Sequence, residues 1–509
     1  MSTSLADPAQ RRDPHPSDPE HRPRRASAAG PLTRLLLRMH FFAGILVGPF
    51  LLIAALSGAA YAIAPTAEQV VYRDMLSASS PAQLVPLADQ VDTARDVHPD
   101  LQLSGVVPGT GGDTTRVLFA DPALPSSSYS RVVFTDPASG EVRGDSVQYG
   151  SGQALPLRTW LSELHRSLHL GDPGRVYSEL AASWLAPIAL GGLVMWWMRR
   201  RRARAPMLRA GARLEGRPKA RSKHAVAGTW IVVGLFFFSA TGLTWSQFAG
   251  GNIGELRTAL GWTTPALDAG APAAEQAPGH EAHEGHEAHE GHEGHEGHGQ
   301  QGPAHEGHGP APSPADTDTD TDTAAAIDIG TAAASARDAG LQDPMELTPP
   351  AGEGAPWLVS ETRRSWTPGP DSVSIDAASG EPVEQIRFAD YPLAAKLTDW
   401  GIRAHMGFLF GAANQLLLAA VALTLVGVIV RGYALWWSRR PGPGRPPTRG
   451  ALLELVRRRP VLTIGGLLVV AVIGWAVPLL GASLVAFLVI DAVLGRWGQR
   501  PSTARAMKK

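Results

Sequence analysis

Four histidines stand at matching positions in a chain that contains no cysteine. His40 and His224 each begin a long apolar run, and 184 residues separate them. His165 and His405 each precede a further apolar run, and 240 residues separate those two. A neutral imidazole offers one nitrogen lone pair to a metal, so two facing imidazoles could hold the iron of a haem from both sides. Ionisable residues are costly inside a membrane, and such pairs therefore indicate a functional site.

The same histidines could instead be interfacial or helix-capping residues. Their repeat-equivalent positions favour haem, and we expect two non-covalent haems b because covalent attachment needs cysteines. His169 lies four residues after His165, on the same helical face, but Leu409 takes the matching place in the second half. His169 is therefore a candidate substitute ligand, a group that supports a ligand, or a surface residue.

The four histidines belong to a longer internal repeat. His40-Phe-Phe-Ala-Gly44 aligns with His224-Ala-Val-Ala-Gly228, and Ser57-Gly58 aligns with Thr241-Gly242. Small residues at these places allow a flat ring or a partner helix to approach closely. Two units of the same orientation imply a pseudo-twofold axis along the membrane normal, which would bring the members of each histidine pair face to face.

The repeat predicts a multi-span α-helical membrane protein with two tandem units and a C-terminal transmembrane hairpin. Each unit consists of a spanning helix, an extracytoplasmic α+β domain and a second spanning helix, and basic flanks place the N-terminus in the cytoplasm. The expected segments are a disordered cytoplasmic tail (1–30), a first span (31–64), a first extracytoplasmic domain (65–155), an amphipathic segment with the second span (156–198), a basic cytoplasmic loop (199–223), a third span (224–248), a second extracytoplasmic domain (249–395) with a low-complexity insertion (270–323), a fourth span with its outer lead-in (396–437), a second basic loop (438–460), the hairpin (461–495) and a cytoplasmic tail (496–509).

The first extracytoplasmic domain is expected to contain one helix and a small antiparallel sheet. Ala88 to Val97 has a helical pattern, and Arg116–Ala120 and Arg131–Thr135 are β-prone runs. Asp136–Glu141 reads as a turn. Leu155 to His169 is amphipathic, and we expect it at the outer membrane surface.

The low-complexity insertion is rich in histidine. Repeats such as Glu-Gly-His place histidines on one side of an extended polyproline-II chain, where they could hold Zn, Cu, Ni or Co loosely. The alternative is a solvated linker in which repeats have expanded. The candidate metal ligands are His280, His283, His286, His289, His292, His295, His298, His305 and His308.

Several other function classes lack support in the sequence. The formal net charge of -1 gives no reason to expect nucleic acid as a partner. There is no Walker loop, no His-Glu-x-x-His and no Gly-x-Ser-x-Gly, and no cytoplasmic segment is long enough for an NAD or flavin domain. An electron donor would therefore be a quinol or a separate cytoplasmic partner.

Three stretches carry a resemblance to a known family. They are His40-Phe-Phe-Ala-Gly44, the segment from His165 to Trp196-Trp197, and the segment from His405 to Arg440. Over roughly 31–440 the chain resembles the PepSY-associated transmembrane family, often called iron-regulated membrane proteins. The resemblance implies two extracytoplasmic PepSY-like domains and an activity similar to that of ferric-siderophore reductases, which pass electrons through b-type haems during iron acquisition. The missing counterpart of His169 and the histidine-rich insertion depart from the family pattern.

These observations predict a multi-pass protein of a bacterial cytoplasmic membrane that lies in the lipid bilayer and reduces a ferric chelate or another metal complex outside. Two alternatives come from different function classes. One is a metal-binding or transport protein that uses the histidine-rich tract. The other is a non-enzymatic sensor or peptidase-modulating protein in which the PepSY-like domains bind a partner.

Overall fold

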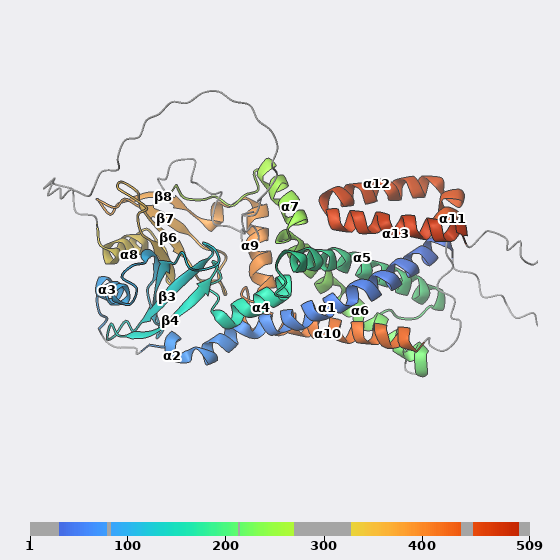
Figure 1. The fold of residues 1–509 in the computed structure, drawn as a ribbon, viewed down its shortest axis with the longest axis horizontal. Coiled ribbons are helices and arrows are strands. Elements are labelled where there is room, and N and C mark those ends of the chain that lie inside the picture. Colours follow the sequence, from blue (N-terminus) through green and yellow to red (C-terminus); the bar gives the residue numbers. More distant parts are fainter. Residues whose placement is uncertain (1–29, 79–82, 212–213, 269–326, 439–450, 498–509) are drawn as a thin grey trace, which may run out of the picture.

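The computed structural model describes residues 30–78, 83–211, 214–268, 327–438 and 451–497. A bundle of long helices forms one end of the molecule, and a β-sheet forms the other (Figure 1). The expected N-terminal tail, histidine-rich insertion and C-terminal tail, and half of the second basic loop, lie outside the described residues.

Four helices are long and apolar enough to cross a membrane: α1 (Pro31–Val71), α5 (Gly171–Ala203), α6 (Gly216–Thr244) and α10 (Gly411–Trp437). The chain is a multi-span helical membrane protein. Helix α1 packs against α5 and α10, and α6 packs against the same two helices, so the four form a ring with α1 opposite α6. At 1.5 Å per residue α1 is about 60 Å long, so it extends well beyond a hydrocarbon core of about 30 Å.

A stripe of small and aliphatic residues fixes α1 in the bundle. Ala43, Val47, Leu51 and Ala55 are spaced by four, which places them on one helical face, and all four are buried. Elsewhere on α1, Tyr433 of α10 donates a hydrogen bond from its hydroxyl to a backbone carbonyl at 2.8 Å. Small residues at such a face allow the backbones to approach closely in an apolar solvent.

The β-strands of the described residues form one antiparallel sheet with the order β4-β3-β2-β1-β5-β6-β7-β8. Strands β1 to β4 and β5 to β8 come from the two expected extracytoplasmic domains, and they join where Val106 pairs with Leu347. Two separate small sheets were expected, and the joined sheet differs because β1 and β5 protect each other's edges. The strands are β1 (Gln102–Val107), β2 (Thr115–Ala120), β3 (Tyr129–Thr135), β4 (Val142–Tyr149), β5 (Met345–Thr348), β6 (Trp357–Glu361), β7 (Ser372–Ile375) and β8 (Pro382–Ile386).

Helices α3 (Leu87–Val97) and α8 (Ile329–Asp338) pack side by side against the sheet. Their alanines and aliphatic residues enter one core with residues of both halves of the sheet, including the fully buried Phe119 and Met345. This shared core explains why the two halves form one α+β unit. The helical turn α2 (Arg73–Leu76) and the 3₁₀ turn η1 (Phe388–Asp390) complete this end of the molecule.

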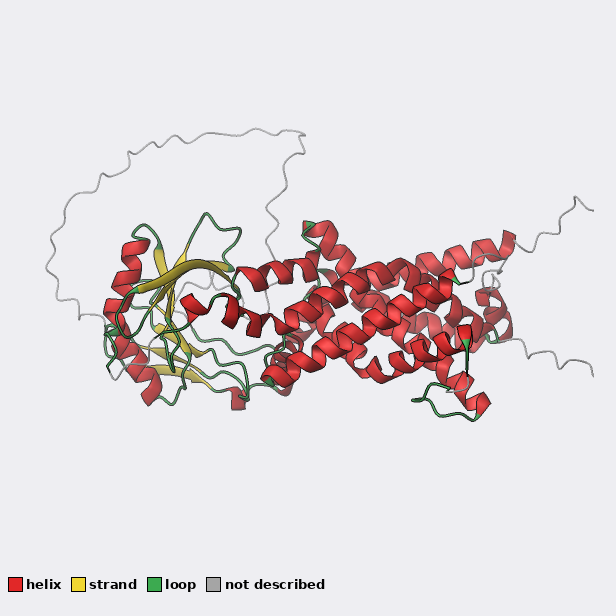
Figure 2. Ribbon diagram, turned by 90° about the horizontal axis from the view of Figure 1, so that it is seen from below, coloured by secondary structure: helices red, strands yellow, loops and turns green. Residues whose placement is uncertain are grey.

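Helices α4 (Pro156–Ser167) and α9 (Leu393–His405) connect the sheet to the bundle (Figure 1). Figure 2 shows the strands gathered at one end of the molecule and the long helices at the other. Glu68 of α1 accepts backbone hydrogen bonds from Leu155 at 3.1 Å and Arg158 at 3.3 Å, which satisfies free N–H groups at the start of α4. Its carboxylate also pairs with the Arg158 guanidinium at 2.9 Å. Helix α4 is therefore fixed to α1 and the sheet, and does not lie alone on a membrane surface.

The C-terminal segment forms a hairpin of the apolar helices α12 (Pro460–Ala476) and α13 (Pro478–Trp497), which α11 (Ala451–Arg458) precedes. The two helices run side by side, and α13 lies along α5 (Figure 1). A buried ion pair joins Asp491 to Arg38 of α1 at 2.7 Å, and the indole of Trp184 donates a hydrogen bond to Ser483 at 2.9 Å. Helix α7 (Phe248–Ala259) also contacts the hairpin.

Candidate functional site

Four of the five candidate haem ligands meet in two pairs. The rings of His40 and His224 lie with their centroids 6.2 Å apart, at the end of the bundle that is far from the sheet. The rings of His165 and His405 lie 6.4 Å apart, at the end near the sheet. We name these the distal pair and the sheet-side pair.

Both separations suit two imidazoles bound to opposite faces of one metal ion. A bound imidazole nitrogen lies about 2 Å from its metal and about 1.2 Å from its own ring centre, so the two centroids should be about 6.4 Å apart. The observed values are 6.2 Å and 6.4 Å. The spacing accommodates one shared iron, and it also lies in the range of roughly 4.5–7 Å found for rings in direct contact.

Backbone carbonyls select the tautomer of the distal pair. His40 Nδ1 lies 2.9 Å from the carbonyl oxygen of Ile188, and His224 Nδ1 lies 2.9 Å from that of Val428. A carbonyl can only accept a hydrogen bond, so each Nδ1 carries the proton. The lone pair is then on Nε2, as a metal ligand requires, and the Nδ1–H bond holds the ring in place.

Hydroxyl groups select the same tautomer in the sheet-side pair. Ser57 Oγ donates its proton to the carbonyl of Ile53 at 2.8 Å, so it accepts from His165 Nδ1 at 3.1 Å. Thr241 likewise donates to a carbonyl one turn earlier at 2.7 Å, and its oxygen accepts from His405 Nδ1 at 2.7 Å. All four histidines are therefore Nδ1–H donors with Nε2 left for a metal.

Glycines make room for two of the rings. A Cβ atom at Gly192 would lie 3.0 Å from Cε1 of His40, and a Cβ atom at Gly58 would lie 3.0 Å from Cε1 of His165. A larger side chain at either position would displace the ring. Glycine has no side chain, so at both positions the helix backbone can approach the imidazole closely.

Empty space adjoins the distal pair. Gly44 lies one helical turn after His40, and Gly228 lies one turn after His224. A Cβ atom at either glycine would meet nothing within 4 Å, and the same holds for the buried Gly191. The helices thus leave a gap on the histidine faces, which a flat macrocycle could fill.

The sheet-side pair opens into a cavity with an empty volume of ≈ 1620 Å³. Apolar residues of α1, α5 and α10 form most of its wall, and both histidine rings line it. Arg166, which pairs with Glu163, and Arg175 also line it, and guanidinium groups suit the two carboxylates of a haem b. The residues present therefore fit haem b at this pair.

Burial keeps the sheet-side pair neutral. His165 and His405 lie on α4 and α9, which are not among the four spanning helices. Burial lowers the pKa of His165 below its usual range. Burial, with a smaller effect of the nearby His165 ring, lowers the pKa of His405 to about 3. Both imidazoles are then uncharged at neutral pH and can act as ligands.

His169 belongs to neither pair. The inference that it shares a helical face with His165 is wrong, because α4 ends at Ser167 and His169 adopts a left-handed φ of 54°. Its ring is exposed and lies 5.1 Å from that of Trp160. This environment is that of a surface residue.

The predicted metal ligands of the histidine-rich tract all lie outside the described residues. Within residues 30–78, 83–211, 214–268, 327–438 and 451–497, no group of three or more His, Asp or Glu side chains is arranged to hold a metal ion. The loosely held divalent metal thus stays a prediction.

Sequence reasoning missed the hydrogen-bond partners of the four paired histidines. Ser57 and Thr241 were singled out for their small size, although a hydroxyl at the matched offset of 184 also signals a shared polar role. Ile188 and Val428 contribute only backbone carbonyls, which leave no trace in the residue type.

Replacing Thr241 by valine should weaken cofactor retention at the sheet-side pair. The change keeps the side-chain shape but removes the acceptor for His405 Nδ1–H, and loss of such a supporting partner typically lowers affinity about 10- to 100-fold. Haem loss to an excess of apomyoglobin measures this. Thr424→Val is the matched control, since Thr424 also bonds a backbone carbonyl of its own helix but does not line the sheet-side cavity. Equal rates for the two variants would contradict the role of Thr241.

The comparisons with known proteins agree with this layout. The family model described as the PepSY-associated TM region matches residues 37–439, which include both histidine pairs and the sheet. No curated protein matches the chain.

Proposed function

Because the chain belongs to the PepSY-associated TM region family, we propose that it is a transmembrane haem protein that carries electrons across a bacterial cytoplasmic membrane to reduce an extracytoplasmic ferric chelate. The proposal includes two haems b, one at the distal pair and one at the sheet-side pair. The acceptor would be a ferric siderophore or a similar complex, taken up for its iron.

One observation carries this proposal: four buried or half-buried imidazoles, all Nδ1–H donors, face each other in two pairs at opposite ends of one helix bundle. When bound, haem supplies a one-electron iron couple to each site. The chain's own residues hold the rings in position and surround them with apolar side chains that exclude water.

Charges at the helix ends support the orientation. Basic residues gather at the bundle end that is far from the sheet: Arg34 and Arg38 on α1, Arg199–Arg202 at the end of α5, and Lys219 near the start of α6. Loops rich in Lys and Arg stay in the cytoplasm. The sheet would then lie outside, and the distal pair would lie near the cytoplasmic face.

A tandem duplication would explain the paired geometry. The acceptors Ile188 and Val428 differ by 240 in number, as do Gly192 and Gly432, each close to a ring of the distal pair. These offsets equal the one that relates His165 to His405 in the sequence. Contacts that recur at a constant offset support two related units about a common axis.

The proposed reaction transfers one electron to each Fe(III), from a quinol or a cytoplasmic donor, and yields Fe(II). Hard oxygen ligands hold Fe(II) less strongly, so the reduction would release the iron. Purified protein in sealed vesicles with a reduced quinone analogue tests this. Ferrous iron trapped by an impermeant chromogenic chelator should form from ferric citrate added outside, at a rate that depends on haem loading. A rate equal to that of empty vesicles would remove the proposal.

Deleting 280–308 should leave haem content and ferric reduction nearly unchanged, within about twofold, because none of the four paired ligands lies in this tract. The metal-handling alternative expects the opposite, namely loss of the response to divalent metal together with loss of function. Deleting the Asp-Thr run at 316–323 is the control for a shortened linker. Haem content by absorbance and the vesicle assay compare the two deletions.

A further inference from the structure

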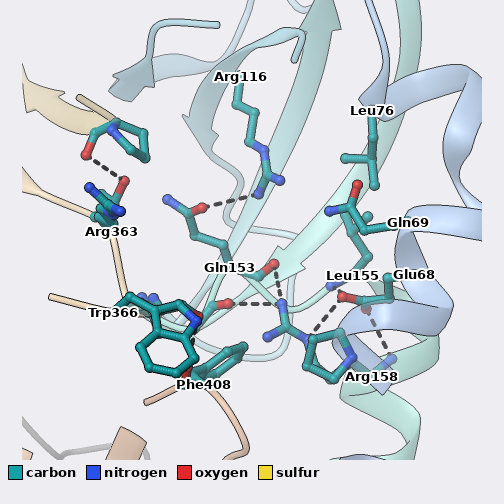
Figure 3. Close-up of a pocket in the computed structure, with 16 residues that line it drawn as sticks. Glu68, Gln69, Leu76, Arg116, Gln153, Leu155, Arg158, Arg363, Trp366 and Phe408 are labelled. Carbon is teal, nitrogen blue, oxygen red and sulfur yellow. Dashed lines mark hydrogen bonds and ion pairs between the residues drawn. The ribbon is translucent and has the colours of Figure 1, made fainter. Parts of the chain in front are cut away.

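A second cavity lies between the sheet and the sheet-side pair, with an empty volume of ≈ 1020 Å³. The end of α1, strand β2, the start of α4 and the segment 362–366 line it. Figure 3 shows Arg116 and Arg158 reaching toward it from different elements, beside Trp366 and Phe408. This cavity plays no part in holding the four histidines.

Positive charge dominates the lining. Arg116, Arg158, Arg363 and Arg364 face one acid, Glu68. Glu68 is paired with Arg158 at 2.9 Å, and Arg116 and Arg363 are further cations on the same wall. An excess of arginine in a concave site favours carboxylate or phosphate oxygens, which match the planar fork of the guanidinium.

Arg116 is the best placed of these cations. Among the described residues it donates one side-chain hydrogen bond, to Gln153 Oε1 at 3.1 Å, and its guanidinium stacks 5.7 Å from the Phe134 ring. Burial, and then the charge of Arg158, lowers the pKa of Arg116. Asp113 and Glu346 lie near it but do not line the cavity. A bound anion would therefore stabilise this charge.

Arg363 adds a second available cation at the rim. Its side chain is exposed, and it has no ion-pair partner in the described part of the chain. The neighbouring Arg364 lies over the Phe408 ring at 5.6 Å. Arginines of the sheet and of the 362–366 segment thus approach the cavity from two sides.

Trp366 is held in a strained position at the mouth. Its φ of 58° is rare for a bulky residue, and its backbone N–H donates to the carbonyl of Leu409 at 3.1 Å. The ring rests 5.5 Å from that of Phe410 and is 67 % exposed. Backbone strain of this kind persists only where the surrounding packing maintains it, and strained residues are concentrated at active sites and ligand sites.

We infer that this cavity binds the acceptor as an anionic, carboxylate-bearing ferric chelate, held by Arg116 and Arg363 against the exposed Trp366. The inference rests on the proposed function and adds the charge and chemical class of its substrate. Net-neutral complexes would bind less well here, since they leave the arginines without partners.

The position of the cavity suits an electron acceptor. Arg158 precedes His165 by seven residues on α4, about 10 Å along the helix axis. Phe408 follows His405 by three residues and contributes to the cavity wall. A ligand in the cavity would therefore lie just beyond the sheet-side pair, against α4 and the segment that follows α9.

Binding of gallium(III) citrate to the full-length protein in lipid nanodiscs tests the inference. Gallium(III) resembles iron(III) in charge and ligand preference but cannot be reduced in this way, so the result does not depend on electron transfer. We expect binding by isothermal titration calorimetry that weakens at least about tenfold in Arg116→Gln and in Arg363→Gln. Arg95→Gln, at an exposed arginine of α3 paired with Asp92, should bind like the wild type.

Three results would overturn the inference. They are no heat of binding at millimolar gallium citrate, equal affinity of the wild type and both cavity variants, or equally tight binding of metal-free citrate or of a neutral gallium trihydroxamate. Arg363 is exposed, so its variant remains informative if Arg116→Gln fails to fold. Loss of ferric reduction with intact gallium binding would instead count against the proposed electron transfer alone.

Discussion

Replacing His405 by alanine should halve the haem content, from two per chain to one, and abolish reduction of the external acceptor. His405 is half of the sheet-side pair, and its ring lies 6.4 Å from that of His165. Loss of a group that merely supports a ligand costs about 10- to 100-fold in affinity, so loss of the ligand itself should cost at least about 100-fold. Pyridine haemochrome assays of purified protein give the stoichiometry, and the vesicle assay gives the rate.

His169→Ala is the matched control for this experiment. The side chain lies close in sequence to the sheet-side pair, but it is exposed and stacks on Trp160. This variant should keep both haems and its reduction rate. If the double variant His40→Ala and His405→Ala retained the activity of the wild type, the sensor alternative would gain support and the electron pathway would lose it.

Replacing Glu68 by alanine should destabilise the junction between the bundle and the sheet by about 3–5 kcal/mol, as the removal of one partner of a buried ion pair typically does. The side chains of Glu68 and Arg158 are each 6 % exposed, and their charged groups lie 2.9 Å apart. The change would also leave the N–H groups at the start of α4 without their acceptor. Intrinsic tryptophan fluorescence during thermal unfolding reports the loss.

Asp92→Ala provides the comparison, because Asp92 pairs with Arg95 on the exposed face of α3. Exposed pairs contribute less than about 1 kcal/mol, so this variant should unfold close to the wild-type temperature. A Glu68→Ala protein as stable as Asp92→Ala would show that α4 is held to α1 by its apolar contacts rather than by this pair.

Both the spanning helices and the histidine pairs can be predicted from the sequence. Long apolar runs with basic flanks define α1, α5, α6 and α10, because a helix satisfies its backbone hydrogen bonds within one segment in lipid. The pairing of His40 with His224 can be predicted because both occupy the same place in repeated sequence. The ligand chemistry of histidine and the internal repeat of the sequence are together enough to predict the histidine pairs.

Other features depend on contacts that no local pattern records. The junction of β1 with β5 joins Val106 to Leu347 across more than two hundred residues, and periodicity predicts strands but not their partners. The end of α4 rests on the left-handed conformations of Leu168 and His169, which are rare for such residues. For this reason the helical spacing of His165 and His169 gave a wrong expectation.

The arginine-lined cavity could not be predicted for a similar reason. Arg116 belongs to β2, whereas Arg158 starts α4 and Arg363 follows β6, so only the folded chain brings them together. Each residue alone resembles an ordinary surface arginine. The close-up in Figure 3 shows Arg116, Arg158 and Arg363 around the cavity, each on a different part of the chain.

The most direct test of the central claim is the reduced-minus-oxidised absorption spectrum of the purified full-length protein after expression with added haem, quantified as the pyridine haemochrome. Two facing pairs of Nδ1-donating histidines predict the sharp bands of a six-coordinate b-type haem and two haems for each chain. Purified protein that is folded but shows no haem band after reduction with dithionite would contradict the account.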